Sequence, residues 1–187
     1  MALENNLGLT SSADLAREEE RISKKKAAQL FDRKLFDTFD VGTFAGLAEI
    51  HQYLFEDIFD FAGEIRTVNL AKGNFHFAPL MYLQAVLHNI DKMPQSTFDE
   101  IVEKYVEMNI AHPFREGNGR STRIWLDHIL KNEISKVVDW SKVDKEDFFG
   151  LSVRALVSKS SLFIRTSICF CTVLFSFVLR ACGSIFP

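Results

Sequence analysis

The chain has 187 residues, of which 47% are hydrophobic and 25% charged, so it can bury one real core, and its length favours a single domain. The formal net charge of −3 gives no overall positive field. This balance argues against direct nucleic-acid binding as the main activity.

The N-terminal segment is predicted to contain a frayed lead-in and a charged helix. Met1–Thr10 lacks periodicity, whereas Ser11–Asp14 supplies capping residues for a helix that runs to about Leu30. Acidic and basic residues follow one another along positions 18–26, which indicates a solvent-exposed face with i,i+4 pairs. Because the start of the chain carries no apolar segment typical of a signal peptide, we expect a cytoplasmic protein.

A second amphipathic helix is predicted over Thr43–Phe55, where apolar residues recur at helical spacing. His51 lies on or beside its apolar face. A histidine in that position is more often a core residue with both ring nitrogens hydrogen-bonded than a catalyst, and we expect the core role.

A short β-hairpin is predicted next, because Arg66–Leu70 and Asn74–Ala78 are strand-like runs around a tight turn at Ala71–Gly73. A two-stranded hairpin is only marginally stable alone, so it must lie on the rest of the protein or accept a partner strand. Lys72 at its tip is placed to reach a nucleotide phosphate; the alternative is an exposed lysine that serves solubility.

Two helices are predicted to flank a polar loop. The first of them follows a helix over Leu80–Met93 and opens with a capping box formed by Thr97 and Glu100. This helix carries the chain directly to His112, and an apolar helical stripe resumes at Ile124. The loop is therefore held between two rigid elements.

The loop, Ala111–Arg123, reads A-H-P-F-R-E-G-N-G-R-S-T-R and combines the residue types that bind phosphate. The Gly-Asn-Gly segment before a helix starting near Arg120 directs backbone N–H groups and the positive helix end at one small volume. Asn118 tolerates the left-handed conformation and can add a side-chain donor. Arg120 and Arg123 project from neighbouring positions of the first turn.

Two further residues of the loop suit catalysis. Glu116 is placed to hold Mg²⁺, which typically takes one or two carboxylates together with substrate phosphates. His112 has an ordinary pKa near 6.5 and can act as a general base. The hydroxyl it would deprotonate must come from outside, because no Ser or Cys of the loop lies beside it with a third orienting group. Phe114 is expected to anchor the loop in the core.

Two common motifs are excluded. The loop lacks the lysine and the glycine spacing of a Walker A motif. One His and one Glu are too few for a zinc site.

His112–Arg123 resembles the complete signature of the Fic family, H-x-F-x-D/E-G-N-G-R-x-x-R. The resemblance covers roughly Thr43 to Trp140, since Arg66–Pro79 is similar to the family's flap hairpin and Lys104–Ala111 to its motif-bearing helix. It implies an all-α fold, a helical bundle with one β-hairpin flap. It also implies Mg²⁺-dependent transfer of AMP from ATP to a Ser, Thr or Tyr hydroxyl of a target protein.

The resemblance also implies roles for single residues. His112 would be the general base, Glu116 the Mg²⁺ ligand, and Arg123 the partner of the γ-phosphate. The flap would bind the target segment as an added strand; modification of the chain itself and oligomers are compatible with the sequence, and no membrane partner is expected. The nucleotide site is expected to comprise Lys72, Asn109, Ile110, Ala111, Gly117, Asn118, Gly119, Arg120, Ser121, Thr122 and Arg123.

Two alternatives stay open. The chain can be a nucleotide-binding or toxin-like interaction protein that has lost its chemistry. It can also be a Fic enzyme that transfers phosphate, UMP or phosphocholine instead of AMP; the complete motif with Glu116 favours AMP.

The end of the chain differs in character. Trp140 and the following polar residues predict a loop into a helix from Asp144, and no acidic residue follows Asp147. The uncharged run Thr166–Leu179 is shorter than the about 20 residues of a membrane span, so a buried helix or strand is favoured, a third possibility being a tail that exposes apolar surface. The chain thus divides into a lead-in (1–40), a catalytic core (41–150) and a divergent apolar tail (151–187).

That tail also lacks a regulatory element. Short relatives in the Fic family end in a helix with an inhibitory motif, S/T-x-x-x-E-G/N, whose Glu pairs with the second motif arginine. No such motif occurs here. We therefore expect a divergent or frame-shifted replacement without self-inhibition in cis. Cys169, Cys171 and Cys182 all lie in this tail, have no metal-ligand spacing with histidine, and are expected to be reduced thiols.

Overall fold

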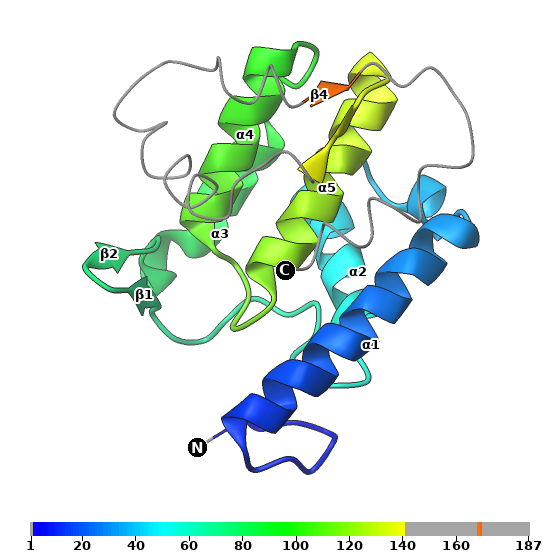
Figure 1. Ribbon diagram of the computed structural model, residues 1–187. Helices are drawn as coiled ribbons and strands as arrows, with labels where there is room; N and C mark the ends of the chain where they lie inside the picture. Colours follow the sequence, from blue (N-terminus) through cyan, green and yellow to red (C-terminus); the bar gives the residue numbers. More distant parts are fainter. Residues whose placement is uncertain (1, 141–167, 170–187) are drawn as a thin grey trace.

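The computed structural model describes residues 2–140 and 168–169. It is a helical bundle built around α5, which packs against α4 on one side and α2 on the other, while α1 covers α2 and α3 covers α4 (Figure 1). The elements are α1 (Ser12–Asp32), the short 3₁₀ helix η1 (Leu35–Thr38), α2 (Phe44–Phe55), β1 (Ala71–Lys72), β2 (Phe75–His76), α3 (Leu80–Asp91), α4 (Phe98–Ala111), α5 (Asn118–Ile134), β3 (Val137–Val138) and β4 (Ile168–Cys169). The predicted all-α bundle with a hairpin flap is confirmed.

The segment before α1 is tied to the core, so the prediction of a frayed lead-in was wrong. The side chain of Asn5 donates to the carbonyls of Leu3 and Leu9, both at 2.8 Å, and closes a small loop. The Asn6 N–H donates to the Ile58 carbonyl at 2.8 Å. Leucines of this segment pack against the core as well, which periodicity alone does not reveal.

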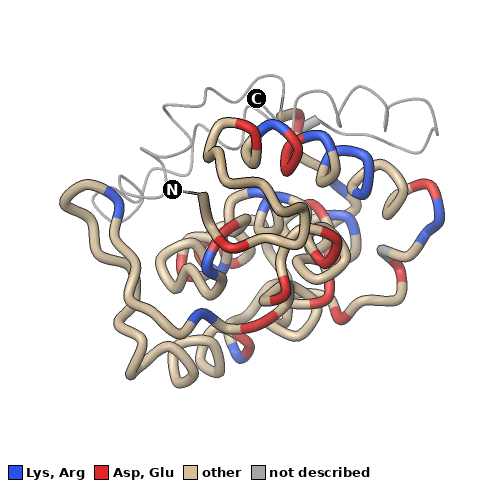
Figure 2. Tube along the Cα trace, turned by 90° about the horizontal axis from the view of Figure 1, so that it is seen from below, with Lys and Arg blue, Asp and Glu red and all other residues tan. Residues whose placement is uncertain are grey.

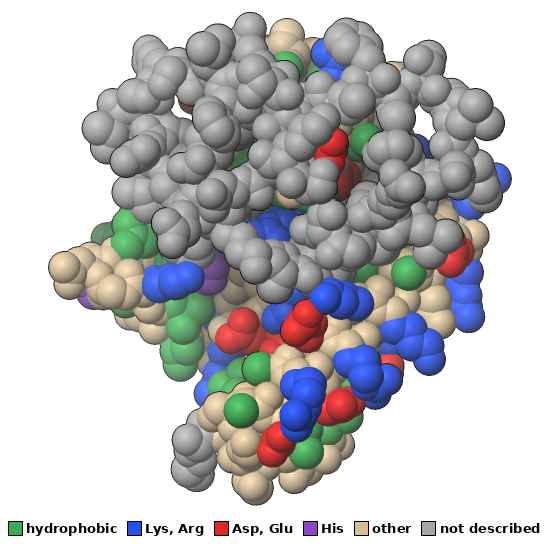
Figure 3. Space-filling model, in the orientation of Figure 1, with side chains coloured by type: hydrophobic (Ala, Val, Ile, Leu, Met, Phe, Trp, Pro, Cys, Tyr) green, Lys and Arg blue, Asp and Glu red, His purple; other side chains and the backbone are tan. Residues whose placement is uncertain are grey.

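The α1 helix begins as predicted, with the Ser11 hydroxyl accepting from the Asp14 N–H at 3.4 Å. Its outer face carries interleaved charges of both signs (Figures 2 and 3), including the i,i+4 pair Lys24–Glu20 at 2.6 Å. Its inner face packs on α2 and adds Leu15, Ala27 and Leu30 to the common core. The segment predicted as a lead-in, 1–40, is therefore packed against the rest of the bundle.

The helix α2 begins next to the predicted start at Thr43, and α4 begins at its predicted capping box. Thr43 accepts from the Gly46 N–H at 3.1 Å, and Thr97 with Glu100 forms the complete capping box. The α3 helix ends at Asp91, two residues before the predicted end. Lys104 of α4, only 2% exposed, donates to the Gln95 side chain at 2.8 Å and to the carbonyls of Asp91, at the end of α3, and Met93.

The flap differs from the predicted hairpin. Its strands are only two residues each, with Ala71 opposite His76 and Lys72 opposite Phe75, and the turn lies at Gly73-Asn74. The predicted strands Arg66–Leu70 and Asn74–Ala78 are wrong in extent, because the hydrogen bonds of their outer residues go elsewhere. Asn69, for example, accepts from the Leu80 N–H at 2.8 Å and caps α3.

At the other end, α5 is followed by β3, which pairs with β4 in antiparallel fashion. The predicted helix from Asp144 lies outside the described residues, as does the predicted tail, 151–187, apart from Ile168–Cys169 in β4. Within the described ranges, none of the helices has the length and apolar character needed to cross a membrane.

Candidate active site

His112 ends α4 in a left-handed conformation with φ 49° and ψ 62°, and its N–H donates to the Met108 carbonyl at 3.1 Å. Its ring stacks on Phe77 of the flap, with 3.8 Å between ring centroids. The ring Nδ1 lies 3.3 Å from the Asn109 carbonyl, which can only accept, so Nδ1 carries the proton. The lone pair of Nε2 is therefore the basic site of the ring.

Burial, with smaller contributions from the positive charges of Arg66 and Lys72, lowers the pKa of His112 to about 4, although the hydrogen bond to the Asn109 carbonyl acts in the opposite direction. The imidazole is neutral at pH 7 and can accept a proton. Lys72, which is exposed on β1, thus lies close enough for its charge to act on His112. The sequence placed Lys72 at the tip of the hairpin, whereas it lies in β1, just before the turn.

The loop after His112 is anchored by aromatic packing, as predicted. Phe114 is fully buried and stacks on the His51 ring with 3.8 Å between centroids. His51 is also fully buried, with Nδ1 accepting from the Gly63 N–H and Nε2 donating to the Glu116 carbonyl, both at 2.9 Å. The prediction of a core histidine with both nitrogens satisfied is confirmed, and burial lowers its pKa to about 4.

Gly117 turns the chain into α5 and has φ 76°. A Cβ there would also lie 2.5 Å from the Phe55 ring, so glycine is needed for both conformation and space. The left-handed position is Gly117, and Asn118 does not use the left-handed conformation that it could tolerate. The Asn118 side chain instead exchanges two hydrogen bonds with the Phe114 backbone, at 2.9 and 2.7 Å, and locks the loop.

The start of α5 carries the backbone donors that the predicted anion site requires. The N–H groups of Asn118, Gly119 and Arg120 belong to the first turn, where no intrahelical acceptor exists. The space beside Gly119 is open, since a Cβ there would meet nothing within 4 Å. An anionic group can therefore approach this backbone at the positive helix end.

Three predicted site residues support the loop through their side chains. Ser121 and Thr122 are fully buried, and their hydroxyls donate to the carbonyls of Gly117 at 3.0 Å and Asn118 at 2.9 Å. The Asn109 amide donates to the Tyr105 carbonyl at 2.7 Å. The Thr122 hydroxyl also lies 3.3 Å from the Asn109 side-chain oxygen, and this contact joins α5 to α4.

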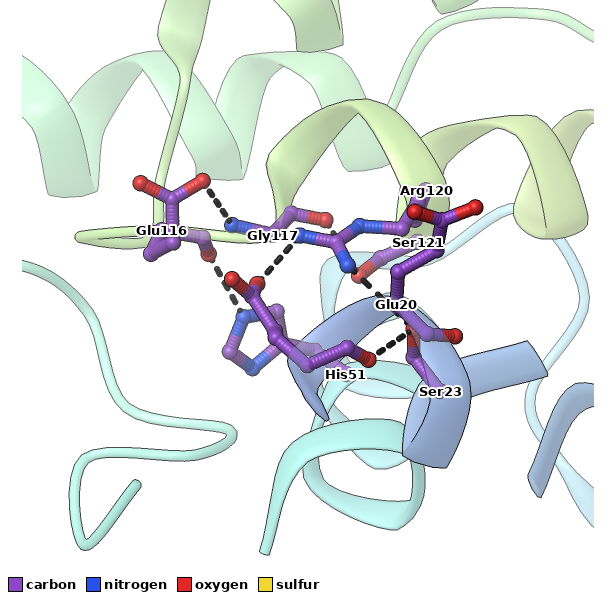
Figure 4. A network of polar contacts seen from close by, with 8 residues as sticks. Glu20, Ser23, His51, Glu116, Gly117, Arg120 and Ser121 are labelled. Carbon is purple, nitrogen blue, oxygen red and sulfur yellow. Dashed lines mark hydrogen bonds and ion pairs between the residues drawn. The ribbon is translucent and has the colours of Figure 1, made fainter. Parts of the chain in front are cut away.

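Arg120 points away from the position that its predicted role suggests. It pairs with Glu19 of α1 and lies 5.0 Å from the Phe55 ring centroid. It also donates to the Ser23 hydroxyl at 3.2 Å (Figure 4). The sequence missed Glu19, which is only 7% exposed. A signal existed, because Glu19 and Ser23 continue the helical spacing of the buried Leu15 and Ala27.

Arg123 lies three residues further along the same helix, and its guanidinium is 5.4 Å from the Trp140 ring centroid. Trp140 is held in turn by Asp127, which accepts from the indole N–H at 2.7 Å and from the Val138 N–H at 3.0 Å. Burial raises the pKa of Asp127 to about 7. The sequence did not predict these contacts of Asp127 and Trp140, because neither residue belongs to a recognisable motif.

Glu116 is exposed at the mouth of the loop, and its Oε1 accepts from the Gly117 N–H at 3.0 Å. Within residues 2–140 and 168–169 there is no cluster of three His, Cys, Asp or Glu side chains that could hold a metal ion. One exposed carboxylate beside an anion site fits Mg²⁺ that takes its other ligands from phosphates and water.

Arg66 is a further residue that the sequence did not identify. It is 3% exposed and donates to carbonyls at both the flap and the end of α4. Its surroundings are described below. No sequence pattern marks an arginine of this kind, since it lay within a run read as a strand.

Comparison with known proteins agrees with this site. Residues 43–130 match the Fic/DOC family. Protein adenylyltransferase VbhT of Bartonella schoenbuchensis is 28% identical over 171 residues, covering 84% of this chain and 34% of that protein. The probable protein adenylyltransferase Fic of Escherichia coli is 30% identical over 111 residues, covering 54% of this chain and 55% of that protein. The chain thus spans between about a third and about half of these relatives' lengths.

Solved structures share the fold. The BepC protein of Bartonella tribocorum with bound AMPPNP has a TM-score of 0.71 at 18% identity, over 92% of this chain and 94% of that one. The N-terminal Fic domain of a putative cell filamentation protein from Bartonella quintana with bound ADP has a TM-score of 0.70 at 19% identity, over 96% and 94%. The family match over residues 43–130, the complete loop motif within them and the shared fold coincide, and we conclude that this segment of the chain forms a Fic/DOC domain.

Proposed function

We propose that the protein is an adenylyltransferase that moves AMP from ATP to a hydroxyl group of a target protein. The observation that carries this proposal is the pairing of a neutral His112, with Nε2 free to accept a proton, with the open anion site at the start of α5. Relatives named as adenylyltransferases, and similar structures that hold AMPPNP and ADP, support the choice of nucleotide.

The chemistry follows from the positions of these groups. Nε2 of His112 takes the proton of a Ser, Thr or Tyr hydroxyl while its oxygen bonds to the α-phosphorus of ATP. The bond from the α-phosphorus to the bridging oxygen breaks, and pyrophosphate leaves with the electron pair. The N–H groups of the first turn of α5 stabilise the phosphate charge, and Arg123 contacts the phosphate farthest from the sugar.

Magnesium belongs to this proposal through Glu116, the exposed carboxylate beside the anion site. When bound, Mg²⁺ neutralises phosphate charge and orients the leaving group. The flap is proposed to hold the target segment as an added strand, and a second copy of the chain is one possible target. A cytoplasmic location is part of the same proposal.

Arg120 is assigned a different role from the one its sequence position suggests. Because Glu19 and Ser23 already engage its guanidinium, we propose that Arg120 fixes α5 to α1 and adds positive potential near the site. The buried position of the ion pair favours this role over a direct phosphate contact.

Two other functions remain as alternatives. A Fic enzyme that transfers phosphate would use the same base with a differently bound nucleotide. A binding protein without chemistry would keep the anion site and transfer nothing.

Labelling separates these functions. The chain is incubated with a cell lysate, Mg²⁺ and ATP labelled at either the α- or the γ-phosphate. We expect α-label on protein and no γ-label. A γ-label on protein would indicate phosphate transfer, and nucleotide binding with no label in any lysate would favour the binding protein.

A further inference from the structure

The flap is joined to the end of α4 by a buried guanidinium. Arg66 Nε donates to the His112 carbonyl at 2.8 Å, and Nη2 donates to the Ala111 carbonyl at 3.2 Å. On the flap side, Nη1 donates to the Val68 carbonyl at 2.6 Å and Nη2 to that of Ala78. One side chain therefore binds two carbonyls of the flap and two at the catalytic helix end.

Backbone hydrogen bonds support the same junction on both sides of the flap. The Arg66 N–H donates to the Pro113 carbonyl at 2.8 Å, and the Ala78 N–H donates to the Ile110 carbonyl at 3.0 Å. Next to Ala78, the Phe77 ring stacks on the His112 ring. Both ends of the flap are thus fixed around the residue proposed as the base.

This arrangement compensates for two costs at His112. The last carbonyls of a helix have no intrahelical donor, and a buried cation satisfies them while meeting the negative end of the helix. His112 itself has a left-handed backbone, which non-glycine residues adopt only where the surroundings hold them. Arg66 supplies such a constraint through the His112 carbonyl.

We propose that Arg66 is a positioning residue that fixes the distance between the flap and His112, and so sets where a hydroxyl held by the flap meets the base. This inference rests on the proposed function, in which the flap holds the target segment. Arginine is needed because four acceptors in two directions require a planar group with five N–H donors. Lysine, with three donors on one nitrogen, does not reach the same set.

The test uses Arg66→Lys and Arg66→Met in the full chain. Lys104→Met is the matched control for stability, since it also removes a buried cation that binds carbonyls, but beyond the far end of α3. Arg33→Met is the control for an exposed arginine. The readouts are hydrogen exchange of the flap amides, above all Ala78, the affinity for ATP, and the rate of AMP transfer.

We expect both Arg66 variants to exchange the Ala78 amide about tenfold faster or more, because buried acceptors lose their donor. Transfer should fall at least as much in kcat, while the Kd for ATP changes by less than about twofold, because the anion site on α5 keeps its own contacts. Lys104→Met should lower overall stability without a specific change at Ala78.

Two results would overturn the inference. The first is that Arg66→Lys keeps both the amide exchange and the transfer rate of the wild type. The second is that Lys104→Met, at the same loss of stability, speeds exchange at Ala78 as much as the Arg66 variants do. The exchange readout does not need catalysis. If the wild-type chain transfers no AMP, the proposed function fails while Ala78 exchange still decides whether Arg66 fixes the flap.

Discussion

At the scale of single residues, the site depends on a few backbone conformations that the motif enforces. Gly117 combines φ 76° with a close approach to the Phe55 ring, whereas Gly73 at the flap turn has φ 58° and open space around it. A side chain at Gly73 would meet only the strain of the left-handed backbone, whereas a side chain at Gly117 would meet that strain and a steric clash as well.

Gly117→Ala should therefore destabilise the protein more than Gly73→Ala does. The flap variant should cost about 1 kcal/mol for the left-handed alanine alone. The loop variant should add about 1–3 kcal/mol for overpacking against Phe55, and should lower transfer because the anion site shifts. Urea unfolding measures both costs, and equal values for the two variants would contradict this account.

At the scale of elements, α1 supports the loop through one ion pair. Glu19 contacts Arg120 from within the packed interface, whereas its neighbour Glu20 pairs with Lys24 on the exposed face. Burial raises the pKa of Glu19, and Arg120 opposes this change. The two acids thus form a matched pair of test positions.

Glu19→Gln should cost about 1–3 kcal/mol of unfolding free energy, because Arg120 keeps a buried charge without its carboxylate. Glu20→Gln should cost less than about 0.5 kcal/mol, as exposed helix pairs do. Chemical denaturation of the two variants checks the difference. A similar small cost at both positions would show that the Glu19 contact is unimportant.

The sequence predicted helices and caps better than it predicted the flap. Periodicity and capping residues are local, so the starts of α1, α2 and α4 were placed correctly. The strands of the flap were overextended because Arg66 and Asn69 make their hydrogen bonds with distant backbone. The packing of the N-terminal segment was not predicted either, because it too depends on hydrogen bonds with distant backbone, such as the one from Asn6 to Ile58.

The same distinction applies to the site. The loop motif predicted the base and the anion site, because their geometry depends on the local backbone. The residues that contact or support this loop come from elsewhere in the chain, among them Glu19, Arg66 and Trp140. Of these three, only Glu19 could have been recognised from the sequence, because it shares the helical spacing of the buried residues of α1.

At the scale of the whole molecule, buried titratable groups make stability depend on pH in opposing ways. Burial lowers the pKa of His51 from 6.5 to about 4, so between these values only the unfolded state binds the proton. Stability is then lost as pH falls from 6.5 to 4. Asp127 acts in the opposite sense, since burial raises its pKa from 3.8 to about 7 and the folded state holds the extra proton.

The contribution of His51 is isolated by comparing the wild type with His51→Gln. The difference in unfolding free energy between the two should shrink by about 3 kcal/mol from pH 7 to pH 4, because only the wild type loses the stability that neutral His51 contributes. The contribution of Asp127 is the same in both proteins and cancels. Denaturation at several pH values measures this difference. A difference that stays constant would mean that His51 does not titrate as its burial requires.

The central claim is that the loop both binds ATP and transfers AMP with His112 as the base. The most direct measurement compares His112→Ala with the wild type, following ATP affinity by calorimetry and α-label transfer to protein in the same preparation. We expect nearly equal ATP affinity, and a loss of transfer by about 100-fold or more, the usual contribution of a general base. Full transfer by His112→Ala would contradict the account.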